Sequence, residues 1–311
     1  MKKIVLILLL ILLTGCNKNE YYTENLFYMD TVVNIKIYNK DKEKVDKAIK
    51  EIDKIYSKYQ NIVNYYDEES ELYKLNNKQI NTVSDELYEL IKIGVDWYYK
   101  TNGLLNINIG PVSEIWHDFR NGIIDFPTDN ILNKNISIDN LELLENNQII
   151  NDSSIDLGSF AKGYVTELAG DYLESIGLDY YIINAGGNVK VGKSHKGYYK
   201  IGIKSPNDNS NFYIVNGENI SVVTSGGYER FYECNGTTYH HIIDPVTKYP
   251  ANYVKSVTVI GEDSTLCDIL STTLFLMNVE DGKEFIKDLD VSVIWYTLDN
   301  EIIKSDGFKY E

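Results

Sequence analysis

The chain has few cysteines, and the three present do not form a recognisable pattern. Cys16 lies close to the N-terminus, whereas Cys234 and Cys267 are far from it and from each other. Two distant cysteines do not supply the disulfide framework of a small secreted domain. The absence of a Cys-x-x-Cys pair or a Cys/His cluster argues against a zinc or iron centre. We therefore expect Cys234 and Cys267 to be free thiols.

Positive charge is also scarce. Lysine and arginine total 30 against 46 aspartates and glutamates, which gives a net charge of −16. This balance argues against a nucleic acid partner, because such proteins present basic surfaces. An acidic protein that binds an anionic ligand needs local compensation from a basic side chain, a helix N-terminus or a divalent cation.

The one long hydrophobic run is Ile4–Leu13. It follows Lys2-Lys3, and its last residue begins the segment Leu13-Thr14-Gly15-Cys16. Ten residues are fewer than the roughly 17 to 25 of a spanning helix. The pattern predicts a lipoprotein signal peptide over residues 1–15 and lipid attachment at Cys16, with an uncleaved anchor as the alternative. Residues 16–28 would then form a polar, tyrosine-rich tether. Both alternatives place the protein on the extracytoplasmic face of the cell membrane.

Internal repeats and low-complexity linkers are absent, so residues 29–311 are expected to form one domain. Alternation of apolar and polar residues predicts strands, and 3.6-residue periodicity predicts amphipathic helices. The mixture, with several hairpins, indicates an α+β fold of largely antiparallel sheets and flanking helices, in two interleaved lobes with a ligand cleft between them. The expected helices span residues 41–59, 84–100, 160–176 and 264–277. The expected strands or extended segments span residues 31–38, 104–112, 155–157, 180–183, 189–191, 212–215, 220–223, 291–296 and 301–304, with a hairpin at Asn216-Gly217.

The segment from Asp156 to Glu167 reads Asp-Leu-Gly-Ser-Phe-Ala-Lys-Gly-Tyr-Val-Thr-Glu. Asp156 and Lys162 flank a Gly-Ser pair where a helix is expected to begin. Free backbone N–H groups and the helix dipole favour an anion there, and a lysine adds a point charge suited to phosphate. The segment lacks the Gly-x4-Gly-Lys-Ser/Thr spacing of a P-loop, so an ordinary helix start is the alternative.

Asp268 and Thr272 are four residues apart, which places them on one face of the apolar helix expected over residues 264–277. A carboxylate in such surroundings needs a strong partner. Carboxylate and hydroxyl oxygens suit magnesium, which binds one or two protein carboxylates together with substrate phosphates. The alternative is a structural aspartate that caps a loop or pairs with Lys162.

Two glycine pairs and a histidine pair complete the candidate site. Gly186-Gly187 and Gly226-Gly227 permit close approach of a flat or phosphorylated ligand, although ordinary turns need glycine too. His240-His241 precedes Asp244-Pro245, and only one of two adjacent histidines in a strand faces a given side. A general base or phosphate donor competes here with a structural histidine.

With these segments assembled, the chain resembles the ApbE family of FAD:protein FMN transferases from about Met29 to Met277. The resemblance is carried by Met29-Asp-Thr31, Gly103 to Pro111, Asp156 to Tyr164, Asn184 to Asn188, Thr224 to Arg230, His240 to Pro245 and Asp268 to Thr272. The chain departs from the family pattern at Asn106, where an acid is common, and at Gly227, where many relatives carry aspartate.

The resemblance implies roles for particular residues. Asp268 and Thr272, with an oxygen from Ser159 or Ala161, would bind Mg²⁺ or Mn²⁺, and His241 would be catalytic, with His240 as the second candidate. The implied FAD contacts are Met29, Ser70, Leu104, Leu105, Asn106, Asp156, Lys162 and Ile242.

The activity implied is Mg-dependent transfer of FMN from FAD to a serine or threonine hydroxyl of an acceptor protein, with release of AMP. The acceptor would be a membrane or extracytoplasmic redox subunit. Two alternatives from other classes are a Mg-dependent FAD pyrophosphatase that gives FMN and AMP, and a flavin-binding lipoprotein without catalysis.

Overall fold

The computed structural model describes residues 21–208, 210–234 and 236–310. The signal segment expected at residues 1–15 and Cys16 lie outside these residues. Within the described part of the chain, no helix has the length and apolarity needed to cross a membrane. Cys234 and Cys267 are free thiols.

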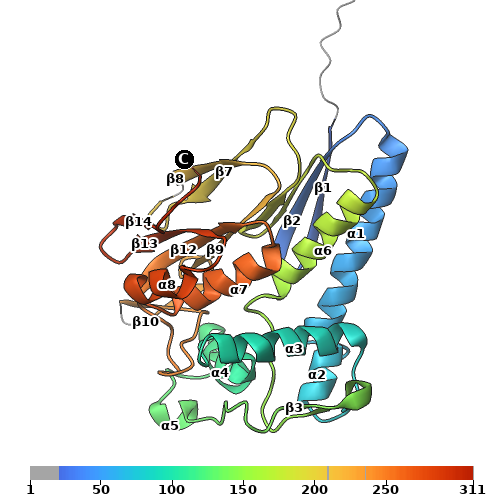
Figure 1. Ribbon diagram of the computed structural model, residues 1–311. Helices are drawn as coiled ribbons and strands as arrows, with labels where there is room; N and C mark the ends of the chain where they lie inside the picture. The colour runs from blue at the N-terminus through green and yellow to red at the C-terminus, as the bar shows by residue number, and fades with distance from the viewer. Residues whose placement is uncertain (1–20, 209, 235, 311) are drawn as a thin grey trace, which may run out of the picture.

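An eight-stranded antiparallel sheet forms the upper layer of the molecule (Figure 1), in the order β1-β2-β5-β6-β9-β12-β13-β14. Its strands are β1 (Tyr21–Tyr28), β2 (Thr31–Tyr38), β5 (Tyr181–Ala185), β6 (Asn188–Val191), β9 (Ile220–Gly226), β12 (Val254–Gly261), β13 (Ser292–Thr297) and β14 (Ile302–Lys304). Three two-stranded sheets accompany it: β3 (Glu142–Leu143) with β4 (Ile149–Ile150), β7 (Tyr199–Lys204) with β8 (Asn211–Gly217), and β10 (Phe231–Cys234) with β11 (Thr237–His240).

Helices cover one face of the large sheet and build a second, lower lobe (Figure 1). The sheet-packed helices are α1 (Lys42–Val63), α6 (Ala161–Ser175), α7 (Ser264–Phe275) and α8 (Val279–Ile286). The lower lobe contains α2 (Glu71–Asn76), α3 (Asp85–Lys100), η1 (Ile107–Ile109), α4 (Gly110–Arg120), α5 (Asp129–Leu132) and η2 (Glu145–Asn147). The β7-β8 hairpin packs on the other side of the sheet through Ile203, Val215 and Val222. The α+β class and the antiparallel sheets are as expected.

Helix starts follow from local chemistry at several positions. The Ser84 hydroxyl accepts a hydrogen bond from Leu87 N at 3.3 Å, and Asp263 Oδ1 accepts one from Leu266 N at 2.9 Å. These side chains satisfy N–H groups that a first turn leaves free. The expected helices at residues 84–100 and 264–277 therefore begin where the sequence indicates.

The tether predicted over residues 16–28 extends too far toward the C-terminus, because part of it is a strand. Tyr21–Tyr28 forms β1, which pairs with β2 over its full length. Partly buried Tyr22, Leu26 and Tyr28 pack against the main core. The sequence of β1 does not show a clear alternation of apolar and polar residues, because several of its residues are polar and the side chain of Phe27 is exposed. These residues therefore belong to the folded unit.

Two extended segments were also predicted wrongly. The segment at 104–112 turns into η1 and α4, because Asn106 Oδ1 accepts from Asn108 N at 2.9 Å and Pro111 suits the first turn of a helix. Residues 155–157 do not join a strand. Both main-chain groups of Ile155 instead bond the side-chain amide of Asn76, at 2.9 and 2.8 Å.

The hairpin expected at Asn216-Gly217 does not form between the two flanking strands. β8 pairs with β7, whereas β9 pairs with β6 and β12 in the large sheet. The chain leaves β8, turns at Asn219 with φ of 53°, and crosses from one sheet to the other. Apolar side chains of β8 and β9 thus face each other from two different sheets. The alternation of apolar and polar residues in the sequence is the same whether two strands pair within one sheet or pack against each other from two sheets.

Candidate active site

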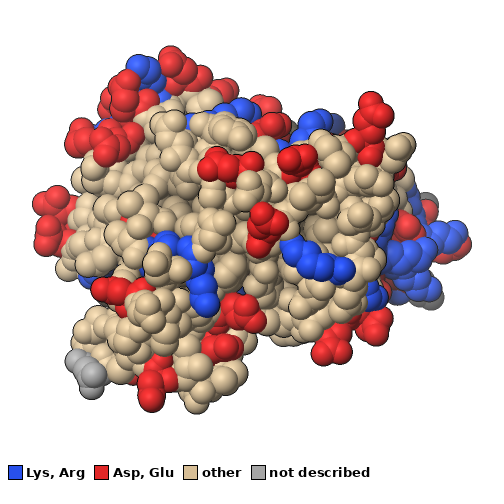
Figure 2. Space-filling model, turned by 90° about the horizontal axis from the view of Figure 1, so that it is seen from below, with Lys and Arg blue, Asp and Glu red and all other residues tan. Residues whose placement is uncertain are grey.

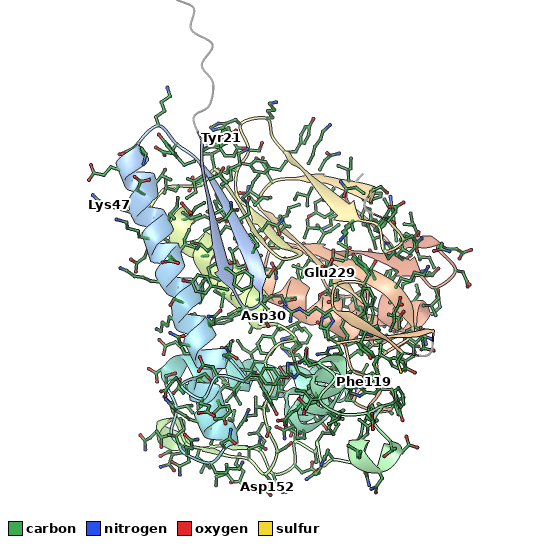
Figure 3. The ribbon with its side chains drawn as sticks, turned by 180° about the vertical axis from the view of Figure 1, so that it is seen from behind. Tyr21, Asp30, Lys47, Phe119, Asp152 and Glu229 are labelled. Carbon is green, nitrogen blue, oxygen red and sulfur yellow. The ribbon has the colours of Figure 1, made fainter. Side chains whose placement is uncertain are left out.

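A cavity of about 610 Å³ lies where the large sheet meets the lower lobe. It is within the size range of ligand pockets. Two cavity-lining residues are labelled in Figure 3: Asp30 in the turn between β1 and β2, and Glu229 in the turn after β9. Phe119 of the lower lobe lies below them, and Tyr21 lies at the far end of β1. Apart from Ser70 and the second candidate histidine, His240, the residues predicted to bind FAD or metal or to be catalytic line it: Met29, Leu104, Leu105, Asn106, Asp156, Ser159, Ala161, Lys162, His241, Ile242, Asp268 and Thr272.

Ser70 lies away from the cavity lining, and its contact with FAD stays a prediction. It is buried, does not line the cavity, and caps α2 by accepting a hydrogen bond from Tyr73 N at 3.0 Å. Its hydroxyl also donates to the carbonyl of Asn64. The cavity residues in this region are instead Val63, Asn64, Tyr65 and Tyr66, and the Tyr66 ring stacks on His117 with centroids 4.2 Å apart.

Asp268 and Thr272 face the cavity from α7. Asp268 is 5% exposed, and its Oδ2 accepts from Gly163 N of α6 at 2.7 Å. Burial raises the pKa of this carboxyl above its usual range, partly opposed by the charge of Lys162. Thr272 Oγ1 donates to the Ser159 carbonyl at 3.1 Å. A carboxylate, a hydroxyl and a main-chain oxygen are thereby gathered at one end of the cavity.

Gly163 allows α6 and α7 to approach closely enough for this contact. A Cβ atom at Gly163 would lie 2.4 Å from Asp268 Cβ and 2.5 Å from the Ser264 carbonyl oxygen. Real Cβ contacts do not reach these distances, so the helices would have to separate. The small residue thus positions the Asp268 carboxylate.

We expect Gly163→Ala to destabilise the protein by about 1–3 kcal/mol, the usual cost of overpacking a core, and to weaken every function of Asp268. Urea unfolding gives the first quantity. Gly282→Ala in α8 is the matched control, because its Cβ would meet Trp295 at a milder 3.1 Å away from the cavity. Equal stability of the two variants would show that the α6-α7 contact tolerates a methyl group.

The N-terminus of α6 opens on the same end of the cavity. Phe160 occupies its N-cap position without a side-chain cap, and Lys162 lies in its first turn. Asp156 just before it is held in a tight turn, with Oδ1 accepting from Gly158 N at 2.8 Å. In this first turn Ala161 N donates to the Leu157 carbonyl at 3.0 Å and Gly163 N donates to Asp268 Oδ2 at 2.7 Å, so the ammonium of Lys162 is the group on this wall that suits an anion.

The two histidines have different environments. His240 is buried, its Nε2 lies 2.8 Å from the Ala251 carbonyl oxygen, and its Nδ1 accepts from Ile242 N at 3.2 Å. Both ring nitrogens of His240 are therefore used by the fold. A Cβ on Gly227 would lie 2.6 Å from this ring, which gives a reason for glycine at that position.

His241 lines the cavity, and its Nδ1 is buried without a hydrogen-bond partner among the described residues. Burial, followed by the charges of Lys162 and Arg230, lowers the pKa of His241 to about 3. The ring is consequently neutral at physiological pH, and His241 rather than His240 faces the cavity.

Sequence reasoning missed one wall of the cavity altogether. Ile109, Ser113, His117 and Arg120 line it from the region of α4. Their spacing of three to four residues is the pattern of one helix face. Because the start of this segment was taken as extended, that periodicity was not recognised.

Among the described residues, no group of three or more His, Cys, Asp or Glu side chains is placed to hold a metal ion. The set at Asp268 contains a single carboxylate together with hydroxyl and carbonyl oxygens. Such a set suits a hard cation that keeps water or substrate oxygens as its remaining ligands.

Comparison with known proteins identifies the family. The model of the ApbE family matches residues 29–295. An FAD:protein FMN transferase of Klebsiella pneumoniae (strain 342) is 30% identical over 308 residues, covering 92% of each chain. One of Vibrio cholerae is 30% identical over 319 residues, covering 96% of this chain and 93% of the relative.

Solved structures agree with the sequence matches. The ApbE protein of Thermotoga maritima superposes with a TM-score of 0.84 at 28% identity, covering 92% of this chain and 97% of that one. The flavin transferase ApbE of Vibrio cholerae gives 0.79 at 26% identity, covering 93% and 98%. The chain belongs to the ApbE family.

Proposed function

We propose that the protein is an FAD:protein FMN transferase that moves FMN from FAD to a serine or threonine hydroxyl of an acceptor protein and releases AMP. The observation that carries the proposal is the shared cavity of Asp268, Thr272, Lys162 and His241. It provides oxygen ligands, an anion-binding lysine and a neutral imidazole within one enclosure. The names of the relatives support the same activity.

We further propose that the Asp268 carboxylate, the Thr272 hydroxyl and the main-chain oxygen of Ser159 or Ala161 would hold Mg²⁺, or Mn²⁺. The fit rests on the donor chemistry and on the environment of Asp268. Its carboxylate is buried, has a raised pKa, and lies within 4 Å of no lysine, arginine or histidine nitrogen in the described chain. A bound cation would neutralise charge on the pyrophosphate and hold the phosphorus for in-line attack.

The residues of the chain then divide the remaining work. Lys162 binds the pyrophosphate and orients it. His241 accepts the proton of the acceptor hydroxyl as its oxygen bonds to the FMN phosphorus, while the phosphorus–oxygen bond to AMP breaks. General base catalysis of this kind contributes roughly 10² to 10⁴ in rate. The lowered pKa keeps the His241 ring neutral in the free protein, and the negative charge of bound FAD beside Lys162 would raise this pKa and make the ring a stronger base.

We also propose that the mature protein is anchored by lipid on Cys16 at the extracytoplasmic face of the membrane, with residues 1–15 removed. The support is the sequence pattern described above. The acceptor would then be a membrane or extracytoplasmic redox subunit, a location that gives it access to this enzyme.

The direct test incubates the lipid-free protein with FAD and Mg²⁺, with and without threonine-containing peptides, and follows peptide mass and released AMP. A peptide mass gain equal to FMN, in step with AMP, is expected. Free FMN and AMP without an adduct would replace transfer by FAD hydrolysis. Bound FAD that stays unchanged would reduce the protein to a flavin carrier.

A further inference from the structure

The folded part of the chain begins close to the proposed site of lipid attachment. Residues 17–20 alone separate Cys16 from Tyr21, the first residue of β1. An extended chain gains at most about 3.6 Å per residue, so the five steps from Cys16 to Tyr21 cover no more than about 18 Å. An uncleaved anchor over residues 1–15 would leave the same short connection. The end of the molecule that carries Tyr21 is therefore held next to the membrane, and Figure 3 places it opposite the lower lobe.

Tyrosines build this end of the molecule, which we call the tyrosine end. Tyr21 pairs with Tyr38 across β1 and β2, and the two ring centroids are 5.6 Å apart. The Tyr38 ring lies 6.2 Å from that of Tyr199, and Tyr38 N donates to the Tyr180 carbonyl at 2.9 Å. Tyr21 is 55% exposed and Tyr198 is 44% exposed. Tyrosine is enriched at membrane–water interfaces, because its ring is apolar and its hydroxyl is polar.

Lysines surround the exposed tyrosines. Residues 193–200, the loop that leads into β7, read Lys-Ser-His-Lys-Gly-Tyr-Tyr-Lys and contain no acid, in a chain whose net charge is −16. The side chains of Lys196 and Lys200 are exposed. The Lys36 ammonium lies 3.9 Å from the centroid of the Tyr21 ring. Basic groups of this kind are attracted to anionic lipid headgroups.

The carboxylates next to this loop are already engaged by it. Asp179 Oδ2 lies 2.9 Å from Lys193 Nζ, and Glu218 Oε2 accepts a hydrogen bond from Ser194 N at 2.7 Å. These contacts hold the beginning of the loop against the rest of the fold. The exposed lysines further along it therefore face solvent without an acidic neighbour in the loop itself.

The opposite end of the molecule does not match an anionic surface. Figure 2 views this end from below, and acidic side chains are spread over it with basic ones among them. The lower lobe exposes Asp125, Asp139 and Asp152. An anionic membrane repels such a surface. Charge and chain connection thus select the same end of the protein.

We propose that the tyrosine end lies on the membrane surface, where Lys36, Lys196 and Lys200 contact anionic lipid headgroups and Tyr21 and Tyr198 enter the headgroup layer. The inference rests on the membrane attachment stated under the proposed function and adds to it the orientation of the enzyme. Each lysine close to an anionic membrane strengthens binding by about fivefold. The lipid holds the chain at the membrane, and this surface determines which way the domain points.

The orientation fixes the height of the cavity. β1 runs from Tyr21 to Tyr28, and Met29 and Asp30, which follow it, line the cavity. Eight residues of a strand span about 27 Å at about 3.4 Å each. The reacting end of the protein is thereby held about 27 Å above the headgroups, and an acceptor hydroxyl has to be presented at that height.

The first test measures the orientation without turnover. The lipidated full chain, on vesicles of phosphatidylcholine mixed with phosphatidylglycerol, is treated briefly with an acetylating reagent, and peptide mass spectrometry gives the rate at each lysine. We expect Lys196 and Lys200 to react at least about fivefold more slowly than in the lipid-free protein, and more slowly than on phosphatidylcholine alone. Lys92 and Lys134, exposed on the lower lobe, should react equally in all three samples. Equal rates at all four lysines, or slowing at Lys92 and Lys134 instead, would overturn the inference.

The second test measures the height. Threonine peptides are joined to a lipid through polyproline spacers, which extend by about 3.1 Å per residue. On the same vesicles, transfer should be fastest with about nine prolines and slower by about 10-fold with none, after division by the rate with a soluble peptide. Lys196→Glu with Lys200→Glu should remove this optimum, and the matched pair Lys92→Glu with Lys134→Glu should keep it. A wild-type rate that did not depend on spacer length would contradict the orientation.

Failure of the proposed function gives a different result. Slow acetylation of Lys196 and Lys200 without any FMN adduct would rule out transfer and leave the membrane surface in place. Adducts on soluble peptides, with Lys196 and Lys200 as reactive on vesicles as in solution, would rule out the membrane surface and leave the transferase intact.

Discussion

Replacing Asp268 by asparagine is expected to abolish FMN transfer while making the ligand-free protein more stable at neutral and alkaline pH. The substitution keeps the shape of the side chain and removes the one carboxylate of the proposed cation site. Loss of several kcal/mol of transition-state stabilisation corresponds to a fall in kcat/KM of about 10³-fold or more. Released AMP and peptide adduct, measured over a Mg²⁺ titration, give this number.

The stability gain follows from the raised pKa of Asp268. A carboxyl whose pKa is higher in the folded than in the unfolded state favours folding at low pH, and this contribution is lost as pH rises through the folded pKa. The asparagine variant does not carry a buried charge above that pH, so its thermal midpoint should exceed that of the wild type there and converge with it in acid. Mg²⁺ should raise the midpoint of the wild type and leave that of the variant unchanged.

Asp171→Asn is the matched control, because it removes an exposed carboxylate from α6. It should leave transfer and the Mg²⁺ response unaltered. An Asp268→Asn variant that turned over FAD at the wild-type rate would rule out a catalytic cation at this position. A variant that lost stability at every pH would show that the carboxylate is structural, held by Gly163 alone.

The sequence was a good guide wherever one local pattern determined an element. Ser84 and Asp263 cap helices that begin as expected, and β2 matches the alternation of its residues. Asp268 and Thr272 of the proposed cation site were also recognisable as a pair, because helical spacing alone places them on one face. Such features depend on neighbours within one turn or one strand.

The errors occur where distant residues decide the conformation. Ile155 lacks a strand partner because the side chain of Asn76 takes both of its main-chain groups. Likewise, β8 and β9 are adjacent in the chain but belong to different sheets. Arg120 was missed for a related reason, since recognising its cavity-facing position requires knowing that α4 exists and which wall it forms.

The histidine pair shows the limit of sequence reasoning most directly. Alternation in a strand implies that only one of His240 and His241 faces the cavity, but it does not say which. The structure decides through hydrogen bonds: His240 is engaged at both nitrogens by Ala251 and Ile242, and His241 leaves Nδ1 without a partner in the described chain. This assignment makes His241 the residue to test.

Replacing His241 by alanine is expected to slow transfer by about 10² to 10⁴-fold with FAD affinity nearly unchanged, because the ring acts on the acceptor hydroxyl and not on FAD. Single-turnover formation of the peptide adduct gives the rate, and flavin fluorescence gives the affinity. Free imidazole should restore part of the rate by entering the space left by the ring. His195→Ala, which removes a ring stacked on Tyr180 away from the cavity, should transfer normally.

The pH dependence of the rate supplies a further test of His241. Because burial and neighbouring cations hold the pKa of His241 at about 3, kcat/KM should show no inflection near 6.5 that depends on this residue. FAD binding places negative charge beside Lys162, which raises the pKa of His241. The pH below which protonation of His241 reduces kcat should therefore be higher than the pH below which it reduces kcat/KM.

The stability of the fold should depend on the same group. A depressed histidine pKa stabilises the folded state above about 6.5, and this contribution is lost as pH falls toward 3. His241→Ala should therefore unfold less readily in acid than the wild type, and a variant that instead lost FAD binding would make His241 a ligand contact and not the base.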